Sequence, residues 1–188
     1  MSHTSHPQKN YTKFYFDDLL SFNERISSID SWSIKKKFDI FNFEENPEIN
    51  SKDIIYMKIA NLWSENSKCD RMKVGSIIVK EKSIISDGYN GTPSGFPDKC
   101  ETPDNVTIAH VLHAEANAIT KLARSTQSSD GSTIYVTLSP CLECSKLIIQ
   151  SGIKRVVFSE TYRNPEPLSF LAQAGIEILK INLEKYAK

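Results

Sequence analysis

Four residues of this chain have the types and the spacing that zinc-dependent hydrolysis needs. His113 and Glu115 form a His-x-Glu pattern, and Cys141 and Cys144 form Cys-x-x-Cys directly after a proline. One imidazole and two thiolates fill three corners of a tetrahedral zinc site and leave the fourth corner to water, as in catalytic zinc sites. A carboxylate two residues after the histidine can then carry protons between that water and a substrate. The sequence therefore predicts a catalytic Zn²⁺ on His113, Cys141 and Cys144.

The predicted chemistry is the hydrolytic removal of an amino group from a nucleobase. His-x-Glu combined with Pro-Cys-x-x-Cys is the pattern of zinc-dependent base deaminases. Zinc bound by two thiolates is formally neutral, so its water needs a proton acceptor before it becomes a zinc-bound hydroxide. We assign that catalytic role to Glu115, which would pass the proton to the ring nitrogen beside the attacked carbon and help to protonate the departing ammonia.

Three other interpretations compete with this one. A structural zinc knuckle or a redox pair would explain Cys-x-x-Cys, but a structural zinc needs a fourth protein ligand and leaves His-x-Glu without a role. A deaminase acting on tRNA adenosine or single-stranded DNA cytidine would share the same zinc and glutamate. A catalytically silent nucleotide-binding relative would have little reason to keep Glu115 beside three ligands.

The composition favours a small substrate over a polynucleotide. The chain has 188 residues, 23 basic and 23 acidic side chains, and a formal net charge of zero. Because nucleic-acid binders usually show a basic excess, no nucleic-acid partner is expected. No apolar run is long enough to span a membrane, and residues 1–16 lack a signal-peptide core, so a cytoplasmic location is expected. Four cysteines in such a chain favour metal ligands or free thiols over disulfides.

Residues 1–50 are predicted to be an N-terminal extension of a domain at 51–188. Residues 1–10 are polar and favour disorder. Apolar residues at helical spacing predict a short helix at 17–29. The segment at 32–43 mixes aromatic residues with three consecutive lysines and is interpreted as a packed extension or an oligomer contact.

From residue 51 the chain predicts alternating helices and strands. A helix at 51–66, capped by Ser51, would place Ile55, Ile59 and Leu62 on one face. The remaining predicted elements are strands at 74–79, 83–89, 133–138, 155–158 and 176–181, and helices from near His113, from Cys141 to Gly152 and at 168–174. This order predicts an α/β fold, a three-layer α/β/α sandwich with a mixed sheet of about five strands. Both ligand-bearing pieces would start helices, where the helix dipole lowers thiol pKa values.

Five motifs, all between residues 67 and 178, identify a family. They are Val-Gly-Ser-Ile-Ile-Val at 74–79, Gly-Tyr-Asn-Gly-Thr-Pro-Ser-Gly at 88–95, His-Ala-Glu-Ala-Asn-Ala-Ile at 113–119, Tyr-Val-Thr-Leu-Ser-Pro-Cys at 135–141 and Ile-Ile-Gln-Ser-Gly-Ile-Lys at 148–154. In these motifs the chain resembles the deoxycytidylate (dCMP) deaminases. The resemblance implies a cytidine deaminase-like fold and conversion of dCMP to dUMP, which feeds dTMP synthesis. It also implies a homo-oligomer, commonly a hexamer. In many members the enzyme is activated by dCTP with Mg²⁺ and inhibited by dTTP.

Several polar residues are candidates for contacts around the substrate. The resemblance implies that Asn90 contacts the sugar or phosphate of the nucleotide, although Asn-Gly is also a common turn signal. Arg71 and Lys73 would supply charge for a phosphate or belong to a solvated face. Asn117 is expected to have a structural role, bonded to the backbone or orienting the loop.

The other two cysteines leave two alternatives open. In some family members cysteines at the positions of Cys69 and Cys100 bind a second, structural zinc. His110 is the nearby histidine that would join them, and Glu101 is a weaker candidate for the fourth ligand. The other alternative is a pair of buried or free thiols.

Overall fold

The computed structural model describes residues 49–163 and 166–186 of the chain. The helix predicted at 17–29 and the segment at 32–43 lie outside the described residues, and the domain boundary near residue 50 stays a prediction. Within the described part, every helix is too short or too polar to cross a membrane.

The core of the fold is a mixed five-stranded sheet in the order β2-β1-β3-β4-β5. Strand β1 pairs antiparallel with both β2 and β3, whereas β3, β4 and β5 run parallel. The strands are β1 (Gly75–Lys80), β2 (Ser83–Tyr89), β3 (Thr133–Leu138), β4 (Arg155–Glu160) and β5 (Glu177–Lys180). The β1–β2 hairpin closes through Glu81 and Lys82, which both have positive φ, as a tight hairpin turn requires.

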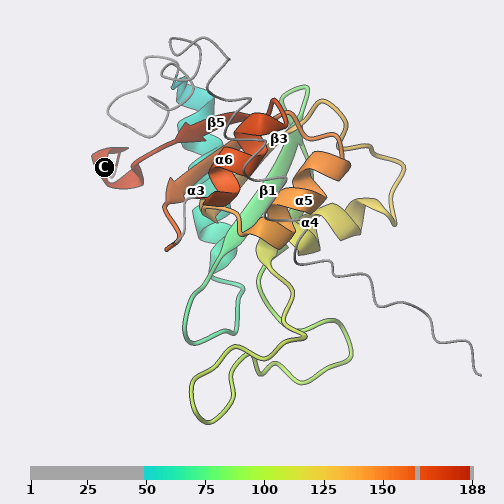
Figure 1. The fold of residues 1–188 in the computed structure, drawn as a ribbon, viewed down its shortest axis with the longest axis vertical. Helices are drawn as coiled ribbons and strands as arrows, with labels where there is room; N and C mark the ends of the chain where they lie inside the picture. Colours follow the sequence, from blue (N-terminus) through green and yellow to red (C-terminus); the bar gives the residue numbers. More distant parts are fainter. Residues whose placement is uncertain (1–48, 164–165, 187–188) are drawn as a thin grey trace, which may run out of the picture. The chain divides into compact units, whose positions relative to one another are not determined.

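Helices cover both faces of this sheet. Helix α3 (Ser51–Ser64) lies on one face, and helices α4 (Ala114–Leu122), α5 (Leu142–Gln150) and α6 (Glu166–Gln173) lie on the other (Figure 1). Successive residues of a strand point to opposite faces, and accordingly Gly75 of β1 contacts α3 while the Ser76 hydroxyl bonds to α4. The predicted three-layer α/β/α sandwich is confirmed.

Helix α3 corrects two details of the sequence prediction. Its N-cap is Asn50 rather than Ser51, because the Asn50 side chain accepts hydrogen bonds from the backbone N–H groups of residues 52 and 53. Its buried face consists of Asp53, Met57, Ala60 and Ser64. The face predicted to be buried is partly solvated, since Ile55 is 54% exposed and Leu62 is 62% exposed.

An ion pair that is largely buried ties α3 to Arg155 of strand β4. Asp53 is 1% exposed, and its two carboxylate oxygens accept hydrogen bonds from the Arg155 guanidinium at 2.7 and 3.1 Å. The Tyr135 hydroxyl donates a third bond to Asp53 at 2.7 Å. Burial raises the pKa of Asp53, but the bonds from Arg155 and Tyr135 outweigh it, so that the pKa is lowered. These contacts explain how an aspartate can occupy the inner face of α3.

Candidate active site

The three predicted zinc ligands lie together at the start of two helices. His113 is the N-cap of α4, Cys141 is the N-cap of α5, and Cys144 lies in the first turn of α5. The His113 Nδ1 atom is 3.4 Å from Cys141 Sγ and 3.5 Å from Cys144 Sγ. In a tetrahedral site, Zn–S and Zn–N bonds of ordinary length place nitrogen and sulfur about 3.6 Å apart. The distances between these side chains therefore fit a Zn²⁺ ion.

The position of His113 outside the helix explains how it shares a site with Glu115. Two residues within a helix point about 200° apart, but His113 has extended backbone angles and precedes the first helical turn. Its side chain is therefore free to turn toward α5 while Glu115 enters the same pocket from the first turn of α4. The predicted placement of both ligand-bearing pieces at helix N-termini is confirmed.

Close packing of α4 against the sheet fixes the position of this first turn. A Cβ atom at Gly88 of β2 would lie 2.2 Å from the Ala114 carbonyl oxygen and 2.6 Å from the Ala118 nitrogen. Glycine is therefore the residue that lets β2 and α4 approach this closely. The buried Ser76 hydroxyl donates to the same Ala114 carbonyl at 2.8 Å.

Two further hydrogen bonds hold α4 to strand β2. The Asn117 amide donates to the Tyr89 carbonyl at 3.0 Å, and the Ser86 hydroxyl donates to the Ala118 carbonyl at 2.6 Å. Asn117 thus has the structural role expected from the sequence. It connects the helix that carries Glu115 to the residue preceding Asn90.

The protonation of the two cysteines is strongly coupled. A hydrogen bond from the Cys144 thiol lowers the pKa of Cys141 to about 3 despite its burial, and His113 lowers it further. The same bond to Cys141, together with burial, raises the pKa of Cys144. The hydrogen bond to Cys141 raises the pKa of His113, against the effect of burial. Since zinc binds thiolates, metal binding at this group would release the proton that the Cys144 thiol holds.

Glu115 has the burial expected of a proton carrier. Its side chain is 4% exposed, and this burial raises the pKa of Glu115 to about 7, against the lowering effects of a backbone hydrogen bond and of His113. A carboxyl group with a pKa near neutrality can both accept and release a proton at physiological pH. A pKa near neutrality is the property that Glu115 needs for the proton transfers assigned to it from the sequence.

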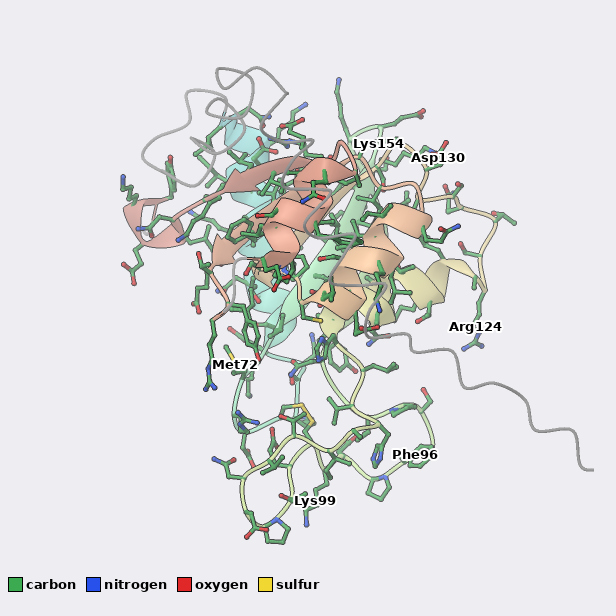
Figure 2. The ribbon with its side chains drawn as sticks, in the orientation of Figure 1. Met72, Phe96, Lys99, Arg124, Asp130 and Lys154 are labelled. Carbon is green, nitrogen blue, oxygen red and sulfur yellow. A yellow bond between two sulfur atoms is a disulfide. The ribbon has the colours of Figure 1, made fainter. Side chains whose placement is uncertain are left out.

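An open pocket joins these groups to polar residues from three other segments. It is lined by Glu115, His113 and Cys141, and also by Asn90, Arg71 and Arg163. Met72 also lines it and marks the pocket's end of the sheet, whereas Asp130 and Lys154 lie at the opposite end (Figure 2). Lys73, the second candidate for a phosphate contact, is exposed and is not part of the lining.

Asn90 uses its side chain to hold the neighbouring segment. Its Oδ1 accepts from the Val74 N–H and its Nδ2 donates to the Met72 carbonyl, each at 2.8 Å. The amide keeps one N–H and one oxygen lone pair beyond these bonds. A contact between Asn90 and a nucleotide stays a prediction.

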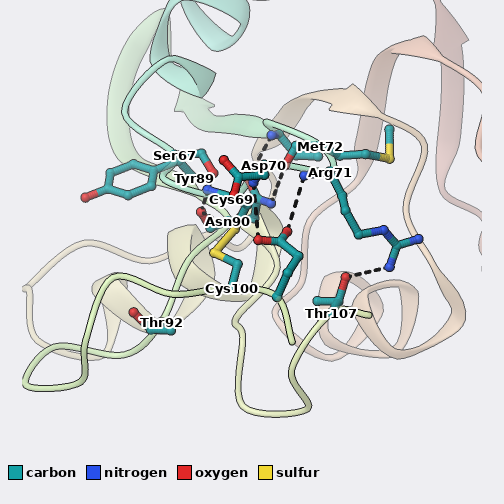
Figure 3. Close-up of a disulfide and its surroundings, with 12 residues drawn as sticks. Ser67, Cys69, Asp70, Arg71, Met72, Tyr89, Asn90, Thr92, Cys100 and Thr107 are labelled. Atoms are coloured by element: carbon teal, nitrogen blue, oxygen red, sulfur yellow. Dashed lines mark hydrogen bonds between the residues drawn. A yellow bond between two sulfur atoms is a disulfide. The ribbon is translucent and has the colours of Figure 1, made fainter. Parts of the chain in front are cut away.

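The predicted second zinc site is different in the structure. Cys69 and Cys100 form a disulfide, which corrects the expectation of metal ligands or free thiols (Figure 3). The carboxylate that lies with the two sulfur atoms is Glu101. The ring of His110 instead packs against Phe96, with ring centroids 5.3 Å apart, so its assignment to this group was wrong. The sequence argument allowed the two cysteines to share a site, but the expected cellular compartment favoured metal ligands or free thiols over a disulfide.

Sequence reasoning missed Arg163 and Tyr162, which also line the pocket. Both follow the end of β4, which runs parallel to β3, and Cys141 follows the end of β3. Parallel strands end at the same edge of a sheet, so the position of Arg163 shortly after β4 could have predicted that it lies near the zinc group.

Comparisons with known proteins agree with this site. The model of the cytidine and deoxycytidylate deaminase zinc-binding region matches residues 50–160. The chain is 36% identical to the deoxycytidylate deaminase of Enterobacteria phage T4, over 69% of this chain and 91% of that protein. It is 34% identical to the deoxycytidylate deaminase of Mus musculus, over 83% and 88%. The chain belongs to the cytidine and deoxycytidylate deaminase family.

A solved structure supports the same assignment. The dCMP deaminase from the cyanophage S-TIM5, determined in complex with dCMP and dUMP, matches with a TM-score of 0.69 at 46% identity. The match covers 71% of this chain and 100% of that one. The fold class expected from the sequence is thereby confirmed.

Proposed function

We propose that this chain hydrolyses dCMP to dUMP and ammonia. The observation that carries the proposal is a single pocket lined by His113 and Cys141, by the buried Glu115 carboxyl and by two arginines, with Cys144 beside the other two zinc ligands. The first two features supply the chemistry of base deamination. The arginines select for a substrate that carries a phosphate. Support comes from the relatives named as deoxycytidylate deaminases and from the similar protein solved with dCMP and dUMP.

Each residue of the zinc group has a defined task in this proposal. His113, Cys141 and Cys144 hold Zn²⁺, which when bound supplies a Lewis acid that activates water. Glu115 accepts a proton from the attacking water and delivers it to the ring nitrogen beside the amino-bearing carbon. It then helps to protonate the leaving ammonia, and a pKa near 7 suits it for both transfers.

Arg71 and Arg163 are assigned to the 5′-phosphate. Arg71 precedes β1 and Arg163 follows β4 in the sequence, and both side chains line the pocket. A guanidinium group matches phosphate oxygens with paired N–H donors. Asn90 contacts the sugar or the phosphate through the part of its amide that the backbone of Met72 and Val74 leaves free.

The test is turnover of four substrates by the purified chain after its zinc has been quantified. dCMP, dCTP, deoxycytidine and a cytosine-containing oligonucleotide are compared by ammonia release. The expected result is about one zinc per chain and a preference for dCMP. Turnover of the oligonucleotide without turnover of any mononucleotide would overturn the proposal and favour a polynucleotide deaminase. Zinc binding with no turnover of any substrate would favour a silent nucleotide-binding protein.

The phosphate assignment has its own test. Arg163→Ala should raise the KM for dCMP by about tenfold, the loss of one charge-assisted hydrogen bond, and leave turnover of deoxycytidine unchanged. Lys73→Ala is the matched control, because it removes the same charge from a neighbouring exposed position outside the pocket lining. An equal effect of the two substitutions would show that general electrostatic attraction, not contact, is responsible.

Family membership supports the wider biological setting of this proposal. The chain would act in the cytoplasm, in the supply of dUMP for dTMP synthesis, as a homo-oligomer such as a hexamer. Activation by dCTP with Mg²⁺ and inhibition by dTTP are proposed on the same basis. Sedimentation of the full chain, with and without each nucleotide, tests assembly and regulation together.

A further inference from the structure

The segment at 67–74, which carries Arg71, is held at its two ends by Asn90. The Asn90 side chain bonds to the backbone of Val74 and Met72, and its carbonyl accepts from the Ser67 hydroxyl at 2.8 Å. These bonds connect the ends of the segment to the last residues of the β2 hairpin. They leave the middle of the segment, where Arg71 lies, to other contacts.

The middle of the segment is tied to the loop that follows β2. The disulfide joins Cys69 to Cys100, and the Glu101 carboxylate accepts the backbone N–H groups of Asp70 and Arg71, both at 3.3 Å. Bonds of this length are weaker than ordinary charge-assisted hydrogen bonds. The disulfide is therefore the strongest connection between the middle of the segment and the loop (Figure 3).

The Arg71 side chain depends on the same loop. Its guanidinium donates to the Thr107 hydroxyl at 2.9 Å (Figure 3). A backbone bridge pairs Thr107 with Glu101. Between β2 and α4 the described chain contains no helix or strand, only that bridge and one between Gly91 and Leu112. The loop extends beyond the ends of the strands (Figure 1). Backbone bonds from Thr102 to Val106 and from Ile108 to Cys100 hold residues 100–108 together, so the disulfide attaches this part of the loop as a unit to Cys69.

We infer that the Cys69–Cys100 disulfide is a positioning element for substrate recognition. It fixes the loop at 100–107 against the segment at 69–71, and the two together hold the Arg71 guanidinium at the pocket. The inference rests on the proposed function, in which Arg71 contacts the phosphate. Removing the link weakens recognition of the phosphate and leaves the zinc group and Glu115 in place, because these lie on α4 and α5 rather than on the loop.

The test is a double-mutant cycle between the disulfide and Arg71. Cys69→Ser with Cys100→Ser removes the link with little change in volume. It should raise the KM for dCMP by about tenfold, keep kcat, and leave the zinc content and the turnover of deoxycytidine unchanged. Arg71→Ala should have a similar effect in the wild-type chain and little further effect in the double serine variant, because Arg71 is already displaced.

Several outcomes would overturn the inference. Additive effects of the two changes would show that Arg71 does not act through the disulfide. An equal rise in KM for dCMP and deoxycytidine would indicate a general structural role. Mass spectrometry of the full chain that finds free thiols at Cys69 and Cys100, or a second zinc in their place, would remove the disulfide from this role. If the double serine variant does not fold, Glu101→Gln, which weakens the remaining tie, should shift the KM for dCMP in the same direction.

The experiment separates this inference from the proposed function. A wild-type chain that does not deaminate dCMP would contradict the proposed function itself. A wild-type chain that deaminates dCMP, with a KM that the serine substitutions do not change, would contradict the positioning role alone.

Discussion

Replacing Gly88 with alanine should displace the helix that carries Glu115. The added Cβ atom would lie 2.2 Å from the Ala114 carbonyl oxygen, and such contacts are essentially never shorter than 3.0 Å. Strand and helix must therefore separate by about 0.8 Å. A displacement of about 1 Å in a catalytic group can cost about 100-fold in rate. We expect Gly88→Ala to lower kcat/KM for dCMP on the order of 100-fold and to weaken zinc binding.

Gly75→Ala provides the matched control. Its Cβ atom would lie 2.1 Å from the Ala60 carbonyl oxygen, so it forces a similar displacement of α3, which carries no residue of the zinc group. Overpacking of this kind costs about 1–3 kcal/mol of stability. Both variants should lose similar free energy of unfolding, measured with urea. The loss of zinc affinity, measured by competition with a chromophoric chelator, should belong to Gly88→Ala.

Two results would refute this reasoning. One is a folded Gly88→Ala variant with the zinc affinity and kcat/KM of the wild type. The other is a Gly75→Ala variant that loses as much zinc affinity as Gly88→Ala. If Gly88→Ala does not fold, Asn117→Ala removes one hydrogen bond between α4 and β2 and should weaken zinc binding in the same direction by a smaller amount.

Three further predictions concern the chemistry and the stability of the fold. Glu115→Gln should keep its zinc but lose about 100- to 10,000-fold in turnover, and retained activity would exclude Glu115 as the proton carrier. Chelation of zinc should abolish turnover but leave the far-ultraviolet circular dichroism spectrum unchanged, because the hydrophobic core between α3 and the sheet does not include the zinc group. Unfolding of the chain on chelation would contradict this prediction. Asp53→Ala should cost about 1–3 kcal/mol in urea unfolding at neutral pH, because it removes the bonds that Arg155 and Tyr135 donate to Asp53 and leaves Arg155 paired with Glu177 alone. The lowered pKa of Asp53 stabilises the fold at pH values above 3.8, the unfolded-state pKa, and this contribution is lost as the pH falls through the still lower folded-state pKa. The difference in free energy of unfolding between the wild type and Asp53→Ala should therefore shrink in acid. A difference that stays constant with pH would argue against the ion pair.

The sheet could be predicted because its strands are marked by local sequence. Strands β2 and β3 have the bounds predicted for them, 83–89 and 133–138. Each strand is a short run that contains β-branched residues and is flanked by turn residues. This signal lies within a few positions of the sequence. The inner strand β1, which lies between β2 and β3, is buried along almost its whole length, as expected for a strand covered by helices on both faces.

The buried face of α3 could not be predicted in the same way. Helical spacing allowed two stripes, and in the predicted stripe Ile55 and Leu62 are exposed while only Ile59 packs against the core. The correct stripe contains Asp53, whose burial depends on Arg155, a partner 102 residues away in the sequence. The close approach of Ala60 depends in turn on Gly75. Neither partner is visible from the helix itself.

The same distinction separates the zinc group from the residues assigned to the substrate. His113, Glu115, Cys141 and Cys144 occur within two short motifs at helix N-termini, so their types and spacing suffice to predict the chemistry. The pocket around them is completed by single residues whose positions depend on distant contacts, such as Arg71 through the disulfide and Thr107. These loop segments can change without altering α4 or α5. Proteins with the same zinc group can therefore differ in substrate, and for this chain the identity of the substrate has to be argued from the loops.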